Sequence, residues 1–438
     1  GNKGPFWLKF FLQPLSSSHD SLPTWLPGGG SVPDGIVGAM SAGVALDVFL
    51  FVNPKSGGNK GKVFLDAPQP FIVDLNDGKQ ANLHIFSLLE GESGKKPGFI
   101  ELKKALQKVS PIRVIVGGGD GTVMWADSEA TKHGIDTPTQ IQFGIVPLGT
   151  GNDFSRVAGW GGKNPSKFLE EECAGLKKMV RNWVAARPRP HDVWQVTLNV
   201  NEARGEIMHV NSEQEEVPID NEETSLSCPM INYFSIGQES KVGIEFDKHR
   251  TKSQLCNLFV YACEGLCTEV QCCDSQHIGN LVAGLHMGTS QSGQVILDSR
   301  GDTRLPEIIG NPESLMFLNI NSYAGGNAHF WQLDSDCGVD PRPDAQWVDV
   351  KADPGDGKLE VITLPNIVNI PLDRLEHSAK RVHSGAPYYV EFFDEDDEDL
   401  DAYCEVDGEF YHLVNPESVT VTLKKRLQVL QRSGTEVP

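Results

Sequence analysis

The sequence is that of a long, acidic chain. It has 438 residues, 39% of them hydrophobic, and a formal net charge of −21 at pH 7. The length predicts two or three domains, and the charge argues against nucleic acid as a partner because its phosphates would be repelled across most of the surface. No run of eighteen apolar residues occurs, so no transmembrane helix is expected. Nine cysteines, an odd number, and the lack of Asn-x-Ser/Thr sites favour reduced thiols and a cytoplasmic location.

The first 43 residues are predicted to form an N-terminal arm or linker. Residues 16–43 are rich in Ser, Pro and Gly, which is typical of a loosely held segment. The preceding stretch, Pro5 to Leu15, carries large apolar side chains in a span too short to cross a bilayer but long enough to lie in its interface. Packing of these side chains on the body of the protein is the alternative.

Residues 44–190 are predicted to form an α/β nucleotide-binding domain with a parallel sheet. Short apolar runs, typical of buried parallel strands, alternate with helical stretches such as Phe99 to Val109. Three of these runs each lead into a glycine-rich loop. The loops read FVNPKSGGNKG from Phe51, VIVGGGDGTV from Val114 and VPLGTGNDFSR from Val146.

Together the three loops predict a polyphosphate site. Glycines let backbone N–H groups approach an anion closely, and a helix N-terminus adds partial positive charge. One glycine-rich turn alone is most often a plain turn, but three at one sheet edge favour a nucleotide-using enzyme. The first loop lacks the final Ser or Thr of a P-loop, and Phe154 stands where a dinucleotide fingerprint has a small residue. The residues expected to bind the nucleotide are Asn53, Lys55, Ser56, Gly57, Gly58, Gly118, Gly119, Gly121, Thr122, Thr150, Gly151, Asn152 and Asp153.

Residues 191–430 are predicted to form a second, β-rich domain with a sandwich-like fold. Short alternating runs such as VWQVTLNV, PMINYFSIG and APYYVEFF are typical of strands. Residues 201–227 are polar and acidic, so a flexible insertion is expected there. The acidic run at 394–401 is expected to be a solvated hairpin loop, and residues 431–438 a tail.

At these motifs the chain resembles the eukaryotic-type diacylglycerol kinases. The blocks Asn53 to Gly58, Gly118 to Thr122 and Pro147 to Asp153 match three loops of the family's catalytic region in the same order. Later blocks, among them Asn232 to Gly237 and Val406 to Glu409, are similar to the accessory half of the family. The resemblance covers residues 45–430 and departs from the family at Gln238-Glu239-Ser240, where Val-Asp-Ala is usual.

The resemblance implies phosphoryl transfer from ATP to a lipid hydroxyl with Mg²⁺. Such a reaction needs a carboxylate to accept the proton of the alcohol. Asp120, inside the second glycine loop, is the first candidate; Mg²⁺ binding and capping of the helix that starts nearby are alternative roles for it. Asp407 and Glu409, in a turn that the resemblance places near the cleft between the domains, compete for the role of base or metal ligand, with a plain hairpin turn as the alternative. Asp353 and Asp356 resemble a pair that binds structural Mg²⁺ in bacterial relatives, although a simple loop explains them equally well.

The function expected from the resemblance is conversion of diacylglycerol to phosphatidic acid by a cytoplasmic enzyme that binds the membrane surface peripherally. Two alternatives stay open: a kinase of sphingosine or ceramide, and a catalytically silent regulator that binds a nucleotide or lipid. The silent regulator is disfavoured because the candidate carboxylates are all present. An NAD kinase would share a similar glycine loop but not the accessory blocks. The sequence does not identify a protein partner.

Overall fold

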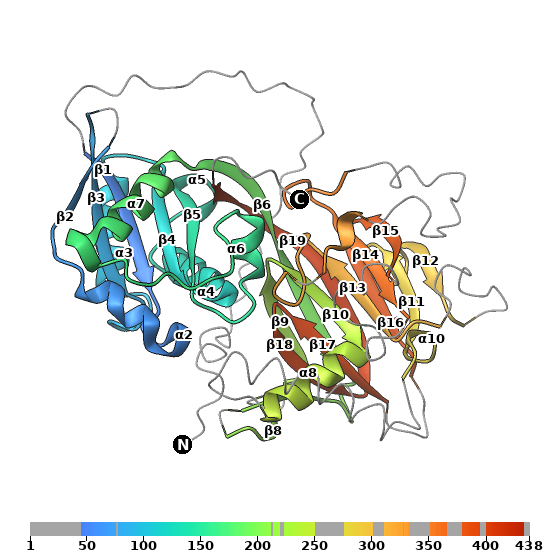
Figure 1. Ribbon diagram of the computed structural model, residues 1–438. Helices are drawn as coiled ribbons and strands as arrows, with labels where there is room; N and C mark the ends of the chain where they lie inside the picture. The colour runs from blue at the N-terminus through green and yellow to red at the C-terminus, as the bar shows by residue number, and fades with distance from the viewer. Residues whose placement is uncertain are drawn as a thin grey trace.

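Two lobes joined by long strands make up the structure (Figure 1). The computed structural model describes residues 45–75, 78–211, 213–219, 223–249, 276–300, 311–326, 328–332, 351–365, 379–394 and 400–432. The predicted arm at 1–43, with the apolar stretch from Pro5 to Leu15, lies outside these residues. Within the described ranges, no helix combines the length and apolar character needed to cross a membrane.

The N-terminal lobe is a mostly parallel sheet with helices on both faces. Its elements in chain order are β1 (Leu46–Val52), α2 (Ser56–Asn59), the 3-10 helix η1 (Lys60–Asp66), β2 (Phe71–Asp74), β3 (Gln80–Ser87), α3 (Pro97–Leu106), β4 (Ile112–Gly118), α4 (Asp120–Lys132), α5 (Thr137–Gln140), β5 (Ile141–Pro147), α6 (Asp153–Val157) and α7 (Glu170–Ala185). The strands β3, β1, β4 and β5 run parallel, and β2 joins the edge antiparallel to β3. This confirms the predicted α/β domain.

The side chains of β1 show why helices cover both faces of this sheet. Successive residues of a strand point to opposite faces. Phe49 and Phe51 pack in one apolar core with Phe99 of α3, while Leu50 packs in another with Trp183 of α7. Both faces are therefore apolar, as expected for parallel strands covered on both sides.

The C-terminal lobe is β-rich. Its elements are β6 (Arg187–Val200), β7 (Glu206–Val210), β8 (Glu216–Pro218), β9 (Ser225–Met230), β10 (Tyr233–Gly237), α8 (Gln238–His249), α10 (Ile278–Leu281), β11 (Val282–Met287), β12 (Gln294–Asp298), β13 (Ser314–Leu318), η2 (Phe330–Gln332), β14 (Leu359–Leu364), β15 (Lys380–Gly385), β16 (Tyr388–Phe392), β17 (Asp401–Val406), β18 (Glu409–Val414) and β19 (Pro416–Gln431). One sheet has the order β15-β14-β13-β10-β17-β18-β7-β8. The strands β6, β9, β11, β12, β16 and β19 belong to the other sheet. One apolar core contains Trp194 and Tyr388 from one sheet and Phe234 and Phe317 from the other, so the predicted sandwich is confirmed.

The two lobes share a sheet through β6 and β19, which pair along most of their length (Figure 1). The end of β19 belongs to the N-terminal lobe. Gln428 and Val429 pair in parallel with β5, and Leu430 packs in a core of that lobe. β6 starts at Arg187 and runs through the predicted domain boundary at 190 without a break. Gln431, expected to begin a tail, still belongs to β19. The C-terminal strand thus completes the N-terminal lobe.

Two expected loops have different structures. The segment 201–227, expected to be a flexible insertion, contains β7, β8 and the start of β9, and β7 pairs with both β8 and β18. Ile207, Ile219 and Leu226 of this segment are buried in the sandwich core. Burial of these apolar side chains stabilises strands here although the segment is rich in acidic residues. The strands on either side of the acidic run 394–401, β16 and β17, lie in different sheets, so the run connects the sheets and does not close a hairpin.

Candidate active site

Three glycine-rich loops meet at the carboxyl ends of neighbouring strands. β5, β4 and β1 are adjacent and parallel, so the loops that follow them leave the same edge of the sheet. A Cβ added to Gly119 would lie 3.3 Å from Gly149 Cα, and one added to Gly57 would lie 3.0 Å from Leu148 O. The loops therefore approach one another closely through their backbones, and a side chain at either glycine would press against the neighbouring loop.

The predicted nucleotide-binding residues all lie on these loops or on the turns that follow them. Ser56, Gly57 and Gly58 lie in α2 after β1; Gly118 ends β4, Gly121 and Thr122 lie in the first turn of α4, and Thr150 and Gly151 lie between β5 and α6. Two of the polar side chains shape their own loops. Asn152, at a φ of 57°, accepts from Gly149 N at 2.8 Å and donates to Gly162 O at 2.9 Å. Asn53 Oδ1 accepts from Lys55 N at 3.1 Å.

Asp120 is the first residue of α4 and lies where the two lobes meet. Its Oδ2 accepts from Phe154 N at 3.2 Å and from Asn232 Nδ2 at 3.0 Å. Its Oδ1 is buried and has no hydrogen-bond partner among the described residues. One oxygen of this carboxylate is thus held by both lobes, and the other is left as an acceptor.

The surroundings of Asp120 favour its protonated form. Burial raises the pKa of Asp120 to about 7, and the negative charges of Asp153 and Asp407 act in the same direction. The hydrogen bonds from Phe154 N and Asn232 Nδ2 oppose this shift because they favour the ionised carboxylate. A carboxylate whose pKa lies near neutral pH is suited to accept and release a proton.

Asp153 holds the third glycine loop against the C-terminal lobe. Its side chain is 2% exposed and accepts three hydrogen bonds, all from that lobe. Ser322 Oγ and Gly326 N donate to Oδ1 at 2.6 and 2.9 Å, and Gly325 N donates to Oδ2 at 3.0 Å. The carboxylate of Asp153 therefore fixes the position of α6 relative to the C-terminal lobe.

Asp407 holds the turn between β9 and β10. Its Oδ2 accepts from Ile231 N at 2.7 Å, and its Oδ1 accepts from Asn232 N at 2.8 Å and Tyr233 N at 3.1 Å. Burial raises the pKa of Asp407 to about 6 even though these three hydrogen bonds lower it. Glu409, the first residue of β18, lies near the buried thiol of Cys228, whose pKa burial raises to about 12 with a smaller contribution from the charge of Glu409.

A pair of buried carboxyl groups lies beside this turn. Glu239 is 1% exposed and accepts from Tyr323 Oη at 2.8 Å. Glu405 is hydrogen-bonded to Glu239, and burial together with the charge of Glu239 raises the pKa of Glu405 well above its usual range. Burial next to Glu239 therefore favours the protonated form of Glu405.

Asp353 and Asp356 lie in the turn that precedes β14. Their carboxylates accept from backbone groups of the same turn, Gly355 N and Lys358 N, each at 2.9 Å. Burial raises the pKa of Asp356. In the described part of the chain, no three His, Cys, Asp or Glu side chains are grouped so as to hold a metal ion.

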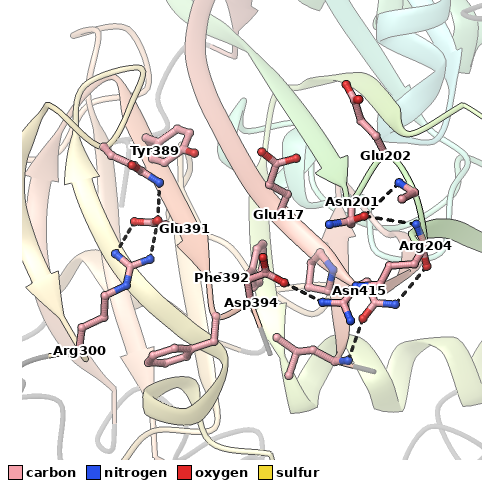
Figure 2. A pocket seen from close by; sticks show the side chains of 15 residues that line it. Asn201, Glu202, Arg204, Arg300, Tyr389, Glu391, Phe392, Asp394, Asn415 and Glu417 are labelled. Carbon is pink, nitrogen blue, oxygen red and sulfur yellow. Dashed lines mark hydrogen bonds and ion pairs between the residues drawn. The ribbon is translucent and has the colours of Figure 1, made fainter. Parts of the chain in front are cut away.

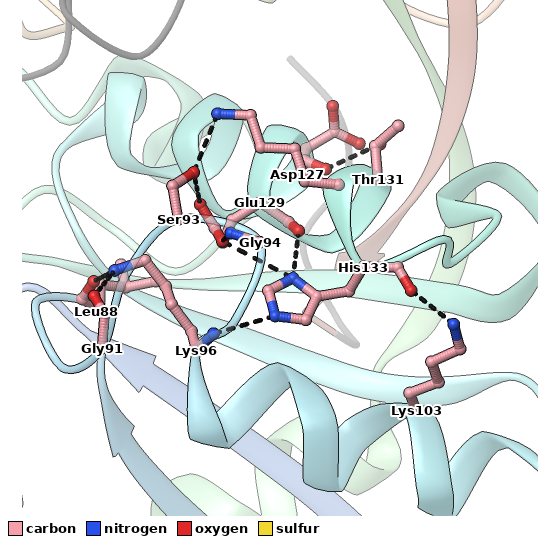
Figure 3. Close-up of polar contacts among 11 residues, drawn as sticks. Leu88, Gly91, Ser93, Gly94, Lys96, Lys103, Asp127, Glu129, Thr131 and His133 are labelled. Atoms are coloured by element: carbon pink, nitrogen blue, oxygen red, sulfur yellow. Dashed lines mark hydrogen bonds and ion pairs between the residues drawn. The ribbon is translucent and has the colours of Figure 1, made fainter.

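The far end of α4 is anchored by a buried polar cluster (Figure 3). Glu129 is fully buried and accepts from Ser93 Oγ at 3.0 Å, and Gly94 N donates to its other oxygen. His133 Nε2 accepts from Lys96 N at 3.0 Å. Because α4 begins at Asp120, this cluster fixes the helix that carries the candidate carboxylate.

A pocket of about 440 Å³ lies on the C-terminal lobe, away from the glycine loops (Figure 2). Its two arginines are already paired: Arg204 Nη2 with Asp394 Oδ1 at 2.7 Å, and Arg300 Nη1 with Glu391 Oε2 at 2.6 Å. None of the residues that line it belongs to the three loops. This pocket is therefore not the phosphate site predicted from the sequence.

Some residues of the site were not predicted from the sequence. Asn232, Ser322, Gly325 and Gly326 contact Asp120 or Asp153 from the accessory lobe. Asn232 begins the block Asn232 to Gly237, and Ser322, Gly325 and Gly326 lie in a further block that also resembles the accessory half of diacylglycerol kinases. These resemblances were the available signal. The resemblance alone assigned them no role.

Comparisons with known proteins agree with this architecture. The sequence model of the diacylglycerol kinase catalytic domain matches residues 47–182, and that of the diacylglycerol kinase accessory domain matches residues 229–410. Human diacylglycerol kinase theta is 31% identical over 339 residues, which are 74% of this chain and 29% of the human protein. The eye-specific diacylglycerol kinase of Drosophila melanogaster is 30% identical over 65% of this chain and 17% of its own length.

A crystal structure of a Bacillus anthracis protein named as a diacylglycerol kinase aligns with 90% of this chain and 99% of its own, with 18% identity and a TM-score of 0.44. Similarity at that level says nothing about activity. The chain spans less than a third of the length of the curated relatives it matches. The segments of this chain that match the catalytic and accessory domain models together make up more than two thirds of its residues. The chain therefore belongs to the diacylglycerol kinase family, with the catalytic domain of that family followed by its accessory domain.

Proposed function

We propose that this protein transfers the terminal phosphoryl group of ATP to the free hydroxyl of diacylglycerol, giving phosphatidic acid. The observation that carries the proposal is Asp120, a carboxylate with one unpartnered buried oxygen and a pKa near 7, at the point where three glycine-rich loops meet. The family membership supports a lipid kinase, and the names of the relatives support diacylglycerol as its substrate.

The loops supply the phosphate-binding groups in this proposal. The backbone N–H group of Gly119 lies where the loops meet, and the N-terminus of α4 adds partial positive charge. The side chain of Lys55 is exposed beside the first loop and supplies a cation for the triphosphate. Asn152 and Asp153 keep the third loop in place instead of contacting phosphate with their side chains.

Asp120 is the proton acceptor in the proposed reaction. With a pKa of about 7, a large share of the protein carries the ionised form at neutral pH. Oδ1 takes the proton of the lipid hydroxyl as the hydroxyl oxygen attacks the terminal phosphorus of ATP, the bond from that phosphorus to the bridging oxygen breaks, and ADP leaves. Oδ2 stays bound to Phe154 N and Asn232 Nδ2. Base roles for Asp407 and Glu409 remain predictions; the two oxygens of Asp407 already accept three backbone hydrogen bonds.

Mg²⁺ fits the residues present at this site. Oδ1 of Asp120 is kept for the proton in this proposal, and the negative charges of Asp153 and Asp407 near it favour a divalent cation that arrives with the phosphates of ATP. When bound, Mg²⁺ would neutralise charge that develops on the phosphates. Binding of Mg²⁺ by Asp353 and Asp356 stays a prediction.

The test is incubation of the purified protein with labelled ATP, Mg²⁺ and a panel of acceptors. Diacylglycerol in mixed micelles should be phosphorylated faster than sphingosine, ceramide or NAD. Faster phosphorylation of sphingosine or ceramide would assign the alternative lipid-kinase function. No transfer to any lipid, together with measurable ATP binding, would favour the silent regulator.

We also propose that the protein reaches diacylglycerol by peripheral contact with the membrane surface. The apolar stretch from Pro5 to Leu15 is the candidate contact, because a chain of net charge −21 gains little from anionic lipid headgroups. Deletion of residues 1–15 should reduce sedimentation with neutral vesicles but spare activity on a dissolved short-chain diacylglycerol. Equal sedimentation of the shortened and the full chain would contradict this role.

A further inference from the structure

Asn232, in the turn between β9 and β10, reaches from the accessory lobe to Asp120. Its Nδ2 donates to Asp120 Oδ2 at 3.0 Å, and the residue is 1% exposed. Phe154 N donates to the same oxygen at 3.2 Å. Both hydrogen bonds therefore fall on Oδ2, which leaves Oδ1 as the unpartnered oxygen of Asp120.

The orientation of the Asn232 amide follows from this contact. Only the NH₂ end of an amide donates hydrogen bonds. A half-turn of the amide would bring Asn232 Oδ1 against Asp120 Oδ2 and replace a hydrogen bond with repulsion between two oxygens. Asn232 Oδ1 is buried and has no partner among the described residues, so no second contact favours the reversed orientation.

The backbone around Asn232 is held from two sides. Asp407 Oδ1 accepts from Asn232 N at 2.8 Å, and Asn319 N donates to Asn232 O at 2.8 Å. Asn319 also donates through Nδ2 to Ile231 O at 2.7 Å. A side chain on a turn fixed in this way loses little further freedom when a ligand binds, which is the condition for accurate positioning.

We infer that Asn232 is a positioning residue for Asp120: by holding Oδ2 it presents Oδ1 to the acceptor hydroxyl, and it makes the accessory domain a part of the catalytic apparatus. The inference rests on the proposed role of Asp120 as proton acceptor. Through Asn232, the accessory domain makes a direct hydrogen bond to the proposed proton acceptor, Asp120. Among the described residues of the catalytic domain, no side chain replaces this contact, since Phe154 donates through its backbone.

The hydrogen bond from Asn232 also favours the ionised form of Asp120. In the part of the chain that the structure describes, the ionisable groups that face this carboxylate are Asp153 of α6, Asp407 of the turn between β17 and β18, and Tyr233 of β10. The two aspartates raise the pKa of Asp120, and Tyr233 stays neutral because burial raises its own pKa well above its usual value. Removal of the Asn232 donor should therefore raise the pKa of Asp120 further.

Two variants test this in the full chain. Asn232→Asp keeps the size of the side chain but replaces the donor with a negatively charged oxygen, and Asn232→Ala removes the side chain. Both should lower kcat for diacylglycerol at least about tenfold and move the acid limb of the kcat–pH profile to higher pH, with the larger shift for Asn232→Asp. KM for ATP should stay near the wild-type value because the glycine loops are untouched.

Asn199→Asp is the matched control. Asn199 lies on β6 of the same lobe and bonds to Ser225 and Ser418, so the same chemical change is made away from Asp120. This control should keep the wild-type pH profile. A shift of equal size in Asn199→Asp would mean that added negative charge or loosened packing, and not the lost contact, moves the profile.

The carboxyl group of Asp120 gives a readout that needs no activity. Infrared difference titration, with Asp120→Asn to assign the band, should show a higher pKa in both Asn232 variants. An unchanged titration, or wild-type kcat and pH profile in a folded Asn232→Ala, would overturn the inference. If the wild-type protein phosphorylates no lipid, the proposed function fails, and the titration still decides whether Asn232 controls Asp120.

Discussion

Ser322 Oγ of the accessory lobe donates to Asp153 Oδ1 of the catalytic lobe at 2.6 Å, and both residues are buried. Gly325 N and Gly326 N complete the set of donors to this carboxylate. Asp153→Ala would leave three donors without an acceptor: the buried hydroxyl of Ser322 and two partly buried glycine N–H groups. We expect it to lower the free energy of unfolding by about 3 kcal/mol or more, measured by urea unfolding.

Ser322→Ala is the graded comparison for this contact. It removes one of three donors and leaves Asp153 bound to the two glycine N–H groups, so the expected loss is about 1 kcal/mol. An equal loss of unfolding free energy in the two variants would show that the hydrogen bond from Ser322 alone, and not all three hydrogen bonds to Asp153, stabilises the contact between the lobes.

Asp120→Asn should abolish phosphoryl transfer and leave the fold intact. The amide keeps the size of the carboxylate but cannot take the proton of the lipid hydroxyl, so we expect a loss of at least about a hundredfold in kcat. Initial rates with labelled ATP and micellar diacylglycerol measure it, and the circular dichroism spectrum serves as the folding check. Wild-type turnover by the folded variant would remove Asp120 from the mechanism.

The sequence predicted the glycine loops and their meeting place well, because local patterns determine them. Parallel strands place their carboxyl ends at one sheet edge, so loops after β1, β4 and β5 had to lie close together. Asp120 could be named because it sits between glycines within one of those loops.

The contacts that tune Asp120 could not be predicted in the same way. Asn232 is 112 residues away in the chain, and no local pattern reports which donor a carboxylate meets. Likewise, Asp407 was recognised as a carboxylate in a turn, but its three backbone partners depend on how that turn packs against residues 231–233. The pairing of β19 with β5 could not be predicted for the same reason. The residue pattern of a strand indicates which of its faces is buried but does not indicate which distant strand lies beside it.

The raised pKa of Asp120 predicts how stability depends on pH. A carboxyl group whose pKa rises on folding binds its proton more tightly in the folded state. Its contribution to stability is complete below the unfolded value of 3.8 and is lost as pH rises through about 7. Between these values the wild type should lose stability relative to Asp120→Asn, measured as the difference in unfolding free energy at each pH. Asp407, whose pKa is raised to about 6 by burial, is present in both proteins, so the effect of its burial cancels and only its interaction with Asp120 enters the difference. A constant difference from pH 4 to pH 8 would contradict the raised pKa.

Gly119→Asp should prevent ATP binding. Its Cβ would lie 3.3 Å from Gly149 Cα, so the carboxylate would extend from the junction of two glycine loops and repel the phosphates. Titration with a non-hydrolysable ATP analogue should show at least about a hundredfold weaker affinity. Gly78→Asp, in the turn between β2 and β3, is the control because it adds the same charge where a new Cβ meets nothing within 4 Å. The positive φ of this position strains any side chain, although Asp adopts it more readily than most residues, so the circular dichroism spectrum of this variant is compared with that of the wild type. Unchanged affinity in Gly119→Asp would place the phosphates elsewhere.

The last prediction concerns the attachment of the C-terminal strand to α4. Lys425 Nζ of β19 lies 2.6 Å from Asp127 Oδ1 and 3.1 Å from Thr137 Oγ1, and Asp127 is 6% exposed. Lys425→Met would leave a buried carboxylate without its cation, so we expect a loss of about 3 kcal/mol in the free energy of unfolding. Asp127→Asn in the same chain removes the uncompensated charge and should restore most of that loss, because the amide still accepts from Thr137 Oγ1. Urea unfolding of the two single variants and the double variant measures the coupling. If the double variant is no more stable than Lys425→Met, the ion pair does not hold β19 on the catalytic lobe, and the pairing of β19 with β5 and the packing of Leu430 account for the attachment.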